Sequence, residues 1–121
     1  MAVIRYLVKD VEQSVAFYTE LLGFEAGERW GSAFATVNLA NLTLWLSGPE
    51  TSAAKPMPDG SQPEPGGWNR LVIETNNITE ILSKLKLSDV VFRNEVLSGP
   101  GGKQILFEDP SGNPIELFEA R

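Results

Sequence analysis

Carboxylates and arginines are the side chains of this sequence best able to do chemistry, because the chain contains no cysteine and no histidine. Without cysteine there can be no disulfide, thiolate nucleophile or cysteine-bound metal. Without histidine the chain lacks the usual general base near neutral pH. Glu116 is the most unusual acid, since it lies between the apolar residues Ile115 and Leu117. Its position predicts either a direct ligand contact or a buried ion pair.

The overall composition indicates one soluble domain. With 121 residues, of which 42% are hydrophobic, the chain can bury a core without disulfides. Its formal net charge of −6 and its lack of clustered Lys and Arg argue against a nucleic-acid partner. No signal peptide and no apolar segment of membrane-spanning length are evident. We therefore expect a cytoplasmic protein that binds neither nucleic acid nor membrane.

The first half of the chain predicts a strand, a helix and three further strands. "VIRYLV" is typical of a buried strand, Asp10 and Gln13 form a capping pattern, and Gly23 can end the helix. Apolar residues recur between them at helical spacing, and we expect Phe17 and Tyr18 to pack in the core. The runs "FEAGERW", "SAFATVNL" and "LTLWLS" then predict strands.

The second half repeats this order after a segment rich in proline and glycine. Residues 48–67 hold five of the eight prolines and four glycines, which predicts either a lid or an exposed linker. "WNRLVIET", a capping pattern at Asn77 and Glu80, and the strands "VVFRNEVL", "KQILFED" and "NPIELFEA" follow. The prediction is an α+β domain over 1–121, built from two βαβββ modules at about 1–47 and 68–121.

Each predicted module has one sheet face covered by its helix and one bare face. Two such modules can curl their bare faces into a shared cup with the helices outside. Alternation along the strands predicts the residues that line this cup: Val3, Arg5, Leu7, Thr43, Trp45, Arg70, Val72, Glu74, Glu116 and Phe118. Among them, Trp45 is expected to stack on a ligand.

Three further side chains have two interpretations each. Trp30 and Trp68 flank predicted strands, where an aromatic ring packs against the core or lines the rim of a pocket, and we favour the core. Arg5 either contacts a ligand or pairs with Glu74 or Glu116, and we favour the ion pair. The turn "DPSGN" has no helix behind it, so we interpret it as a connection between strands and not as a phosphate site.

The paired modules, together with "VKDVEQSVAFYTELLGFE" and "DPSGNPIELFE", resemble the vicinal oxygen chelate superfamily. This is the group of glyoxalases, bleomycin-resistance proteins and extradiol dioxygenases, and the likeness covers nearly the whole chain. The resemblance implies the paired-module fold and commonly a homodimer. It does not assign a reaction, because the superfamily includes both metal enzymes and metal-free drug-binding proteins.

Most metal ligands implied by this resemblance are replaced. Val3 and Arg70 stand where histidines are implied, and Trp45 stands where an acid is implied. Glu116 alone matches its counterpart, the glutamate of the last strand. One carboxylate beside an arginine cannot hold a divalent cation tightly, so we predict no metal and no other cofactor. We also predict that Arg70 pairs with Glu116 in place of the cation.

These observations leave three possible functions. We favour a metal-free protein that holds a planar or aromatic ligand, for drug resistance or sequestration. The residues predicted to bind it are Trp45, Arg70, Glu116, Phe118, Arg5, Trp30 and Trp68. The alternative is a glyoxalase-like lyase, isomerase or dioxygenase in which Glu116 acts as an acid, a base or a metal ligand. The third is a structural or regulatory dimer whose cup is filled by its own side chains.

Overall fold

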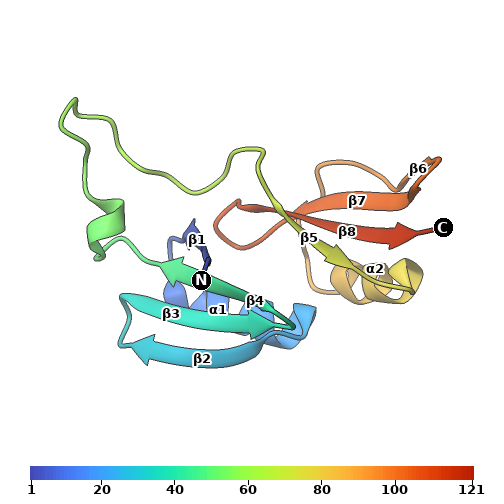
Figure 1. Cartoon of the computed structure of the whole chain (residues 1–121), viewed down its shortest axis with the longest axis horizontal. Helices are drawn as coiled ribbons and strands as arrows, with labels where there is room; N and C mark the ends of the chain where they lie inside the picture. Colours follow the sequence, from blue (N-terminus) through green and yellow to red (C-terminus); the bar gives the residue numbers. More distant parts are fainter. The chain divides into compact units, whose positions relative to one another are not determined.

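The computed structural model describes residues 1–121 and divides them into two units, Met1–Gly66 and Gly67–Arg121 (Figure 1). Each unit holds one α-helix and one four-stranded mixed sheet. The predicted α+β class and the two βαβββ modules are confirmed. Neither α-helix combines the length and the apolar composition that crossing a membrane would require.

Module 1 is a sheet in the order β1-β4-β3-β2, in which β1 pairs with β4 in parallel and the other pairs are antiparallel. Its elements are β1 (Ile4–Leu7), α1 (Val11–Leu22), β2 (Glu25–Trp30), β3 (Phe34–Leu39) and β4 (Leu42–Ser47). The helix packs against β2, β3 and β4. The side chains buried on the helix side of β3 and β4 are Ala35, Val37, Leu44 and Leu46, as alternation predicts.

Helix α1 begins and ends where the sequence predicts. The Asp10 carboxylate accepts a hydrogen bond from the backbone N–H of Gln13 at 2.8 Å, which satisfies a donor of the first turn. Gly23 ends the helix in the left-handed region, with φ of 76°. Phe17 and Tyr18 are buried and meet edge to face, so their predicted core positions are confirmed.

Module 2 repeats this topology in the order β5-β8-β7-β6, again with a parallel pair between its first and last strands. Asn77 caps the helix by accepting from the N–H of Glu80 and by donating to the Glu80 carboxylate. The elements are β5 (Leu71–Glu74), α2 (Ile78–Lys86), β6 (Leu97–Gly99), β7 (Gly102–Glu108) and β8 (Pro114–Ala120).

The strand predicted over "VVFRNEVL" is wrong for most of its length. Strand β6 begins only at Leu97, and the preceding residues contribute a single bridge between Phe92 and Phe107. The side chain of Asn94 accepts the N–H of Leu106 at 2.9 Å, in the place of a backbone carbonyl. Two backbone bonds flank the bridge, from Arg93 N–H to the Leu106 carbonyl and from Glu108 N–H to the Val91 carbonyl, both at 2.9 Å. The pairing with β7 is therefore short and ends at the Asn94 side chain.

The segment that follows β4 is a loop, as predicted, but it has local structure of its own. Ser52–Ala54 form the short 3₁₀ helix η1, and the Gln62 side chain donates to the Ala54 carbonyl at 3.0 Å. Further along the loop, Ser61 donates its hydroxyl and its backbone N–H to Asp59 at 2.6 and 3.0 Å. These bonds lower the pKa of the Asp59 carboxyl.

Candidate functional site

Three aromatic rings and one arginine form a continuous group on module 1, which we call the aromatic face. The Arg5 guanidinium lies over the Trp45 ring, 5.0 Å from its centroid. Phe34 meets Trp45 edge to face at 5.6 Å, and Trp30 lies 5.4 Å from Phe34. Trp45 alternates along β4 with buried residues of the helix side, so the aromatic face points away from α1.

The aromatic face unites three of the predicted binding residues and adds one that the sequence analysis missed. Arg5 and Trp45 are register partners on β1 and β4. Phe34 was overlooked, although its alternation with Ala35 was a signal that it faces away from the core. The core position favoured for Trp30 is wrong, because its side chain is 57% exposed on the edge strand β2 and rests on Phe34.

The predicted ion pair between Arg70 and Glu116 is present in module 2. Arg70 Nη2 lies 2.9 Å and Nε 3.1 Å from the same carboxylate oxygen, Oε1, which leaves Oε2 outside the pair. Glu116 is buried, whereas 31% of the Arg70 side chain is exposed. A buried carboxylate needs an opposite charge or strong donors, and the guanidinium supplies both.

These residues do not fit a divalent cation. The side chains of Val3 and Trp45 offer no oxygen or imidazole ligand to a metal. The Glu116 carboxylate is already paired with the guanidinium of Arg70. In neither module do three or more acidic side chains converge on one point. The chemistry that the superfamily's metal would supply therefore has no matching set of ligands in either module.

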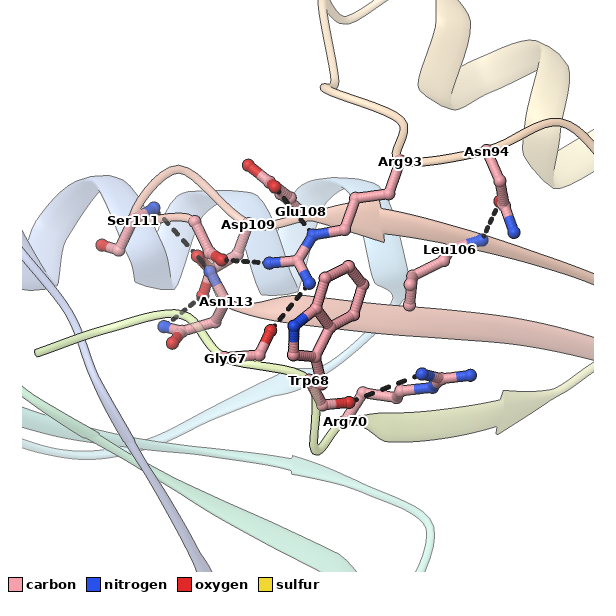
Figure 2. A network of polar contacts seen from close by, with 11 residues as sticks. Gly67, Trp68, Arg70, Arg93, Asn94, Leu106, Glu108, Asp109, Ser111 and Asn113 are labelled. Carbon is pink, nitrogen blue, oxygen red and sulfur yellow. Dashed lines mark hydrogen bonds and ion pairs between the residues drawn. The ribbon is translucent and has the colours of Figure 1, made fainter.

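A second arginine, Arg93, connects several segments of module 2, and we call its contacts the Arg93 clamp (Figure 2). Its Nε pairs with Glu108 at 2.8 Å, and its two terminal nitrogens donate to the carbonyls of Gly67 at 2.7 Å and Gly112 at 3.0 Å. The guanidinium also lies 4.7 Å from the Trp68 ring centroid. One side chain thus ties together the entry to β5, the end of β7 and the last turn.

The Arg93 clamp explains Trp68, whose predicted core position is wrong. Trp68 is 71% exposed, and Figure 2 shows its indole beside Arg93. Its carbonyl accepts from Arg70 at 3.5 Å, so the clamp and the Arg70–Glu116 pair are neighbours along the chain. Sequence analysis missed Arg93 because it lies in the run interpreted as a strand.

The remaining predicted residue, Phe118, lies apart from the Arg93 clamp. It is half-buried on β8 and lines a pocket of about 300 Å³ with residues of β6 and of the β6–β7 turn, including Leu97 and Pro100. The "DPSGN" turn is structural in this arrangement. The Asp109 carboxylate accepts the backbone N–H groups of Ser111 and Asn113 at 2.8 and 2.9 Å.

Comparison with known proteins places this fold in a family. Residues 1–117 match the profile of the Glyoxalase/Bleomycin resistance protein/Dioxygenase superfamily. The chain belongs to this superfamily. The mitochondrial methylmalonyl-CoA epimerase of Bos taurus is 31% identical over 93% of this chain and 70% of its own length. The resemblance seen in the sequence is thereby confirmed.

Solved structures of the glyoxalase superfamily share the fold over nearly the full chain. A member from Sphaerobacter thermophilus has a TM-score of 0.73 and 28% identity, covering 98% of this chain and 97% of its own. TnmS3, an antibiotic binding protein from a Streptomyces species, has a TM-score of 0.71 and 25% identity. That match covers 100% of this chain and 97% of TnmS3. These likenesses establish the fold and leave the ligand to be inferred from the side chains.

Proposed function

We propose that this glyoxalase-superfamily protein binds a planar small molecule on the aromatic face of module 1, without a bound metal, for sequestration or resistance. The observation that carries the proposal is the continuous group of Arg5, Trp45, Phe34 and Trp30. Adjacent rings offer stacking area, and the guanidinium offers two parallel donors to a carboxylate or phosphate. The preferred ligand is therefore an aromatic or conjugated anion.

The aromatic face is not needed to build the core of module 1. The buried aliphatic residues of β3 and β4 lie on the opposite side of the sheet, against α1. Large aromatic rings left accessible to solvent lose the stability that burial would provide, so their clustering favours a ligand. Trp30, the most exposed of the three, is the ring best able to move onto a bound molecule.

Two further observations support binding without a metal. The Arg70–Glu116 pair already neutralises the acid that matches the metal ligand of the superfamily. The similarity to an antibiotic binding protein, at 25% identity over the full chain, is consistent with a member that binds a small molecule.

Calorimetric titration with 2-naphthoate tests the proposal, with naphthalene as the uncharged comparison. We expect saturable binding of 2-naphthoate to the metal-stripped protein, weakened about tenfold or more by Trp45→Ala and by Arg5→Gln. Trp68→Ala is the matched control, because its ring belongs to the Arg93 clamp of module 2. Unchanged affinity in both Trp45→Ala and Arg5→Gln would exclude the aromatic face as the site.

A second candidate is an isomerase in which Glu116 transfers a proton. Two observations favour it: Oε2 of this buried carboxylate lies outside the ion pair, and the 31% identical relative is named an epimerase. A carboxylate can remove and return a proton at an acidic carbon. Deuterium exchange into methylmalonyl-CoA from heavy water, lost in Glu116→Gln, would support this candidate. Absence of exchange at high protein concentration would leave the binding function alone.

A further inference from the structure

A polar residue, Asn38 of β3, lies on the same side of the sheet as the aromatic face. It alternates along β3 with Val37, which is buried on the helix side. Its register partner on β4 is Thr43, two residues before Trp45. Arg5 pairs with Trp45 from the other flank, on β1. From the usual spacings of strands and residues in a sheet, the backbones of Arg5 and Asn38 lie roughly 12 Å apart.

The Asn38 amide is held in place by one hydrogen bond and keeps its donor group free. Thr43 Oγ1 donates to Asn38 Oδ1 at 2.8 Å, which orients the amide. The Nδ2 nitrogen carries two N–H bonds and donates to no other group. Ser47 Oγ is the only buried side-chain nitrogen or oxygen that lacks a partner, so Nδ2 is not buried. The nitrogen is therefore available to a molecule bound on this side of the sheet.

Gly27, on the neighbouring edge strand β2, leaves this nitrogen uncovered. A Cβ at Gly27 would lie 3.0 Å from Asn38 Nδ2 and would collide with Thr36 Oγ1. The pairing of β2 with β3 is irregular here, and Thr36 Oγ1 accepts the N–H of Glu28 at 2.9 Å. Gly27 thus contributes no side chain that would cover the Asn38 amide.

The two ends of this side of the sheet carry different charges. Arg5 supplies a cation at one end, over the Trp45 ring. At the other end, the register partner of Asn38 on β2 is Glu25, an exposed acid. Like charges repel, so a second negative group on a ligand is disfavoured beside Asn38. An uncharged oxygen is favoured there, because the amide N–H can donate to it.

We propose that Asn38 selects planar anions that carry an uncharged carbonyl oxygen at the end opposite to their negative group. This inference rests on the binding proposed for the aromatic face and specifies its ligand class. The negative group lies at Arg5, the ring system covers Trp45, and the carbonyl oxygen accepts from Asn38 Nδ2. Two fused rings with substituents at opposite ends have a length of the order that separates these residues. A site that donates this hydrogen bond discriminates against analogues without the acceptor.

Calorimetric titration with two matched ligands tests the proposal. They are 2-naphthoate and 6-(methoxycarbonyl)-2-naphthoate, an ester that adds a carbonyl acceptor and no charge. We expect the metal-stripped protein to bind the ester about fivefold more tightly. Asn38→Ala should abolish this preference. Asn38→Asp, which keeps the oxygen that Thr43 donates to and removes the donor, should abolish it as well. Asn41→Ala, at an exposed asparagine of the β3–β4 turn, is the matched control and should retain the preference.

A third ligand, 2,6-naphthalenedicarboxylate, tests the charge at the Asn38 end. Its second carboxylate lies beside Glu25, so it should bind about fivefold more weakly than the ester. Glu25→Gln should reduce this difference, because the repulsion is removed.

The outcomes separate this inference from the proposed function. Suppose that 2-naphthoate binding depends on Trp45 and Arg5, but the ester has no advantage or keeps its advantage in Asn38→Ala. The inference is then wrong, and binding on the aromatic face stands. A dicarboxylate that binds as tightly as the ester would also contradict the inference. If no ligand binds, or if all bind equally well to Trp45→Ala, the proposed function is wrong and the inference fails with it.

Discussion

Glu116 is a buried carboxylate whose charge is balanced by one guanidinium, that of Arg70. The pair could be predicted from the family resemblance, because Arg70 and Glu116 stand at two positions that the resemblance implies are ligands of one metal. The positions of the exposed tryptophans could not be predicted in this way. Exposure at Trp30 and Trp68 depends on the edge of a sheet and on Arg93, which strand alternation does not reveal.

Removing either partner of the Arg70–Glu116 pair should destabilise the protein. We expect Arg70→Met and Glu116→Gln each to lower the free energy of unfolding by about 1–3 kcal/mol, less than for a fully buried pair because Arg70 is partly exposed. Urea denaturation of both single variants and the double variant measures the coupling. Lys103→Met, at an exposed cation on β7, is the control and should change stability by less than about 0.5 kcal/mol. Strictly additive single effects would show that the pair contributes nothing.

The helices were predictable at the level of elements because their signals are local. Capping residues, apolar spacing and Gly23 all lie within the segments that they define. The length of the strand in the run before β6 was not predictable. Its β-branched composition is typical of a regular strand, whereas only residues 91–93 bond to the backbone of β7. The side chains of Arg93 and Asn94 bind groups far along the chain, and regular pairing with β7 does not continue beyond them.

The Arg93 clamp should depend on the shape of arginine and not on charge alone. A lysine at this position keeps the charge but cannot reach Glu108, Gly67 and Gly112 together, so Arg93→Lys should cost about 2 kcal/mol of stability. Urea denaturation measures the loss, and Trp68 fluorescence reports the change at the ring. Arg121→Lys, which loses one exposed contact to Gly99, is the matched control. Equal stability of the two variants would contradict the role assigned to the clamp.

The β6–β7 turn offers a test of backbone geometry with two nearby glycines. Gly102 has φ of 150°, and a Cβ there would collide with the backbone carbonyl of Glu119 on β8. We expect Gly102→Ala to lower the free energy of unfolding by more than about 2 kcal/mol. Gly99→Ala should be nearly neutral, because no atom lies within 4 Å of the added Cβ. Thermal unfolding of both variants measures these changes in stability. An unchanged stability of Gly102→Ala would show that β7 and β8 can move apart to accommodate the added Cβ without cost.

At the scale of the whole molecule, the repeated order of elements was the strongest signal in the sequence. It predicted two modules because each half carries its own cap, helix and strand runs. The shared cup and the homodimer stay predictions, because they concern surfaces whose partners are not encoded in local spacing. The identity of the ligand could not be predicted from sequence patterns either. It depends on how the exposed side chains of each sheet are arranged in space.

The donor sets of both modules predict that the protein works without a metal. Elemental analysis of protein purified without chelator should find far less than one Zn, Fe, Ni or Mn per chain. Treatment with chelator should change neither the unfolding temperature nor the affinity for 2-naphthoate. One equivalent of any of these metals, lost together with binding after chelation, would contradict the interpretation of the Arg70–Glu116 pair.

The parallel pairing of first and last strands has a consequence for biosynthesis. Ile4 pairs with Leu44, so β1 leaves the ribosome well before its partner exists, whereas α1 can form at once from local contacts. Module 1 becomes complete only when β4 has emerged, and β5 is not made until the proline-rich loop has followed. This interval lets the first sheet close before the strands of the second can compete for its edges. Translation order therefore favours pairing within the first sheet over exchange with strands of the second.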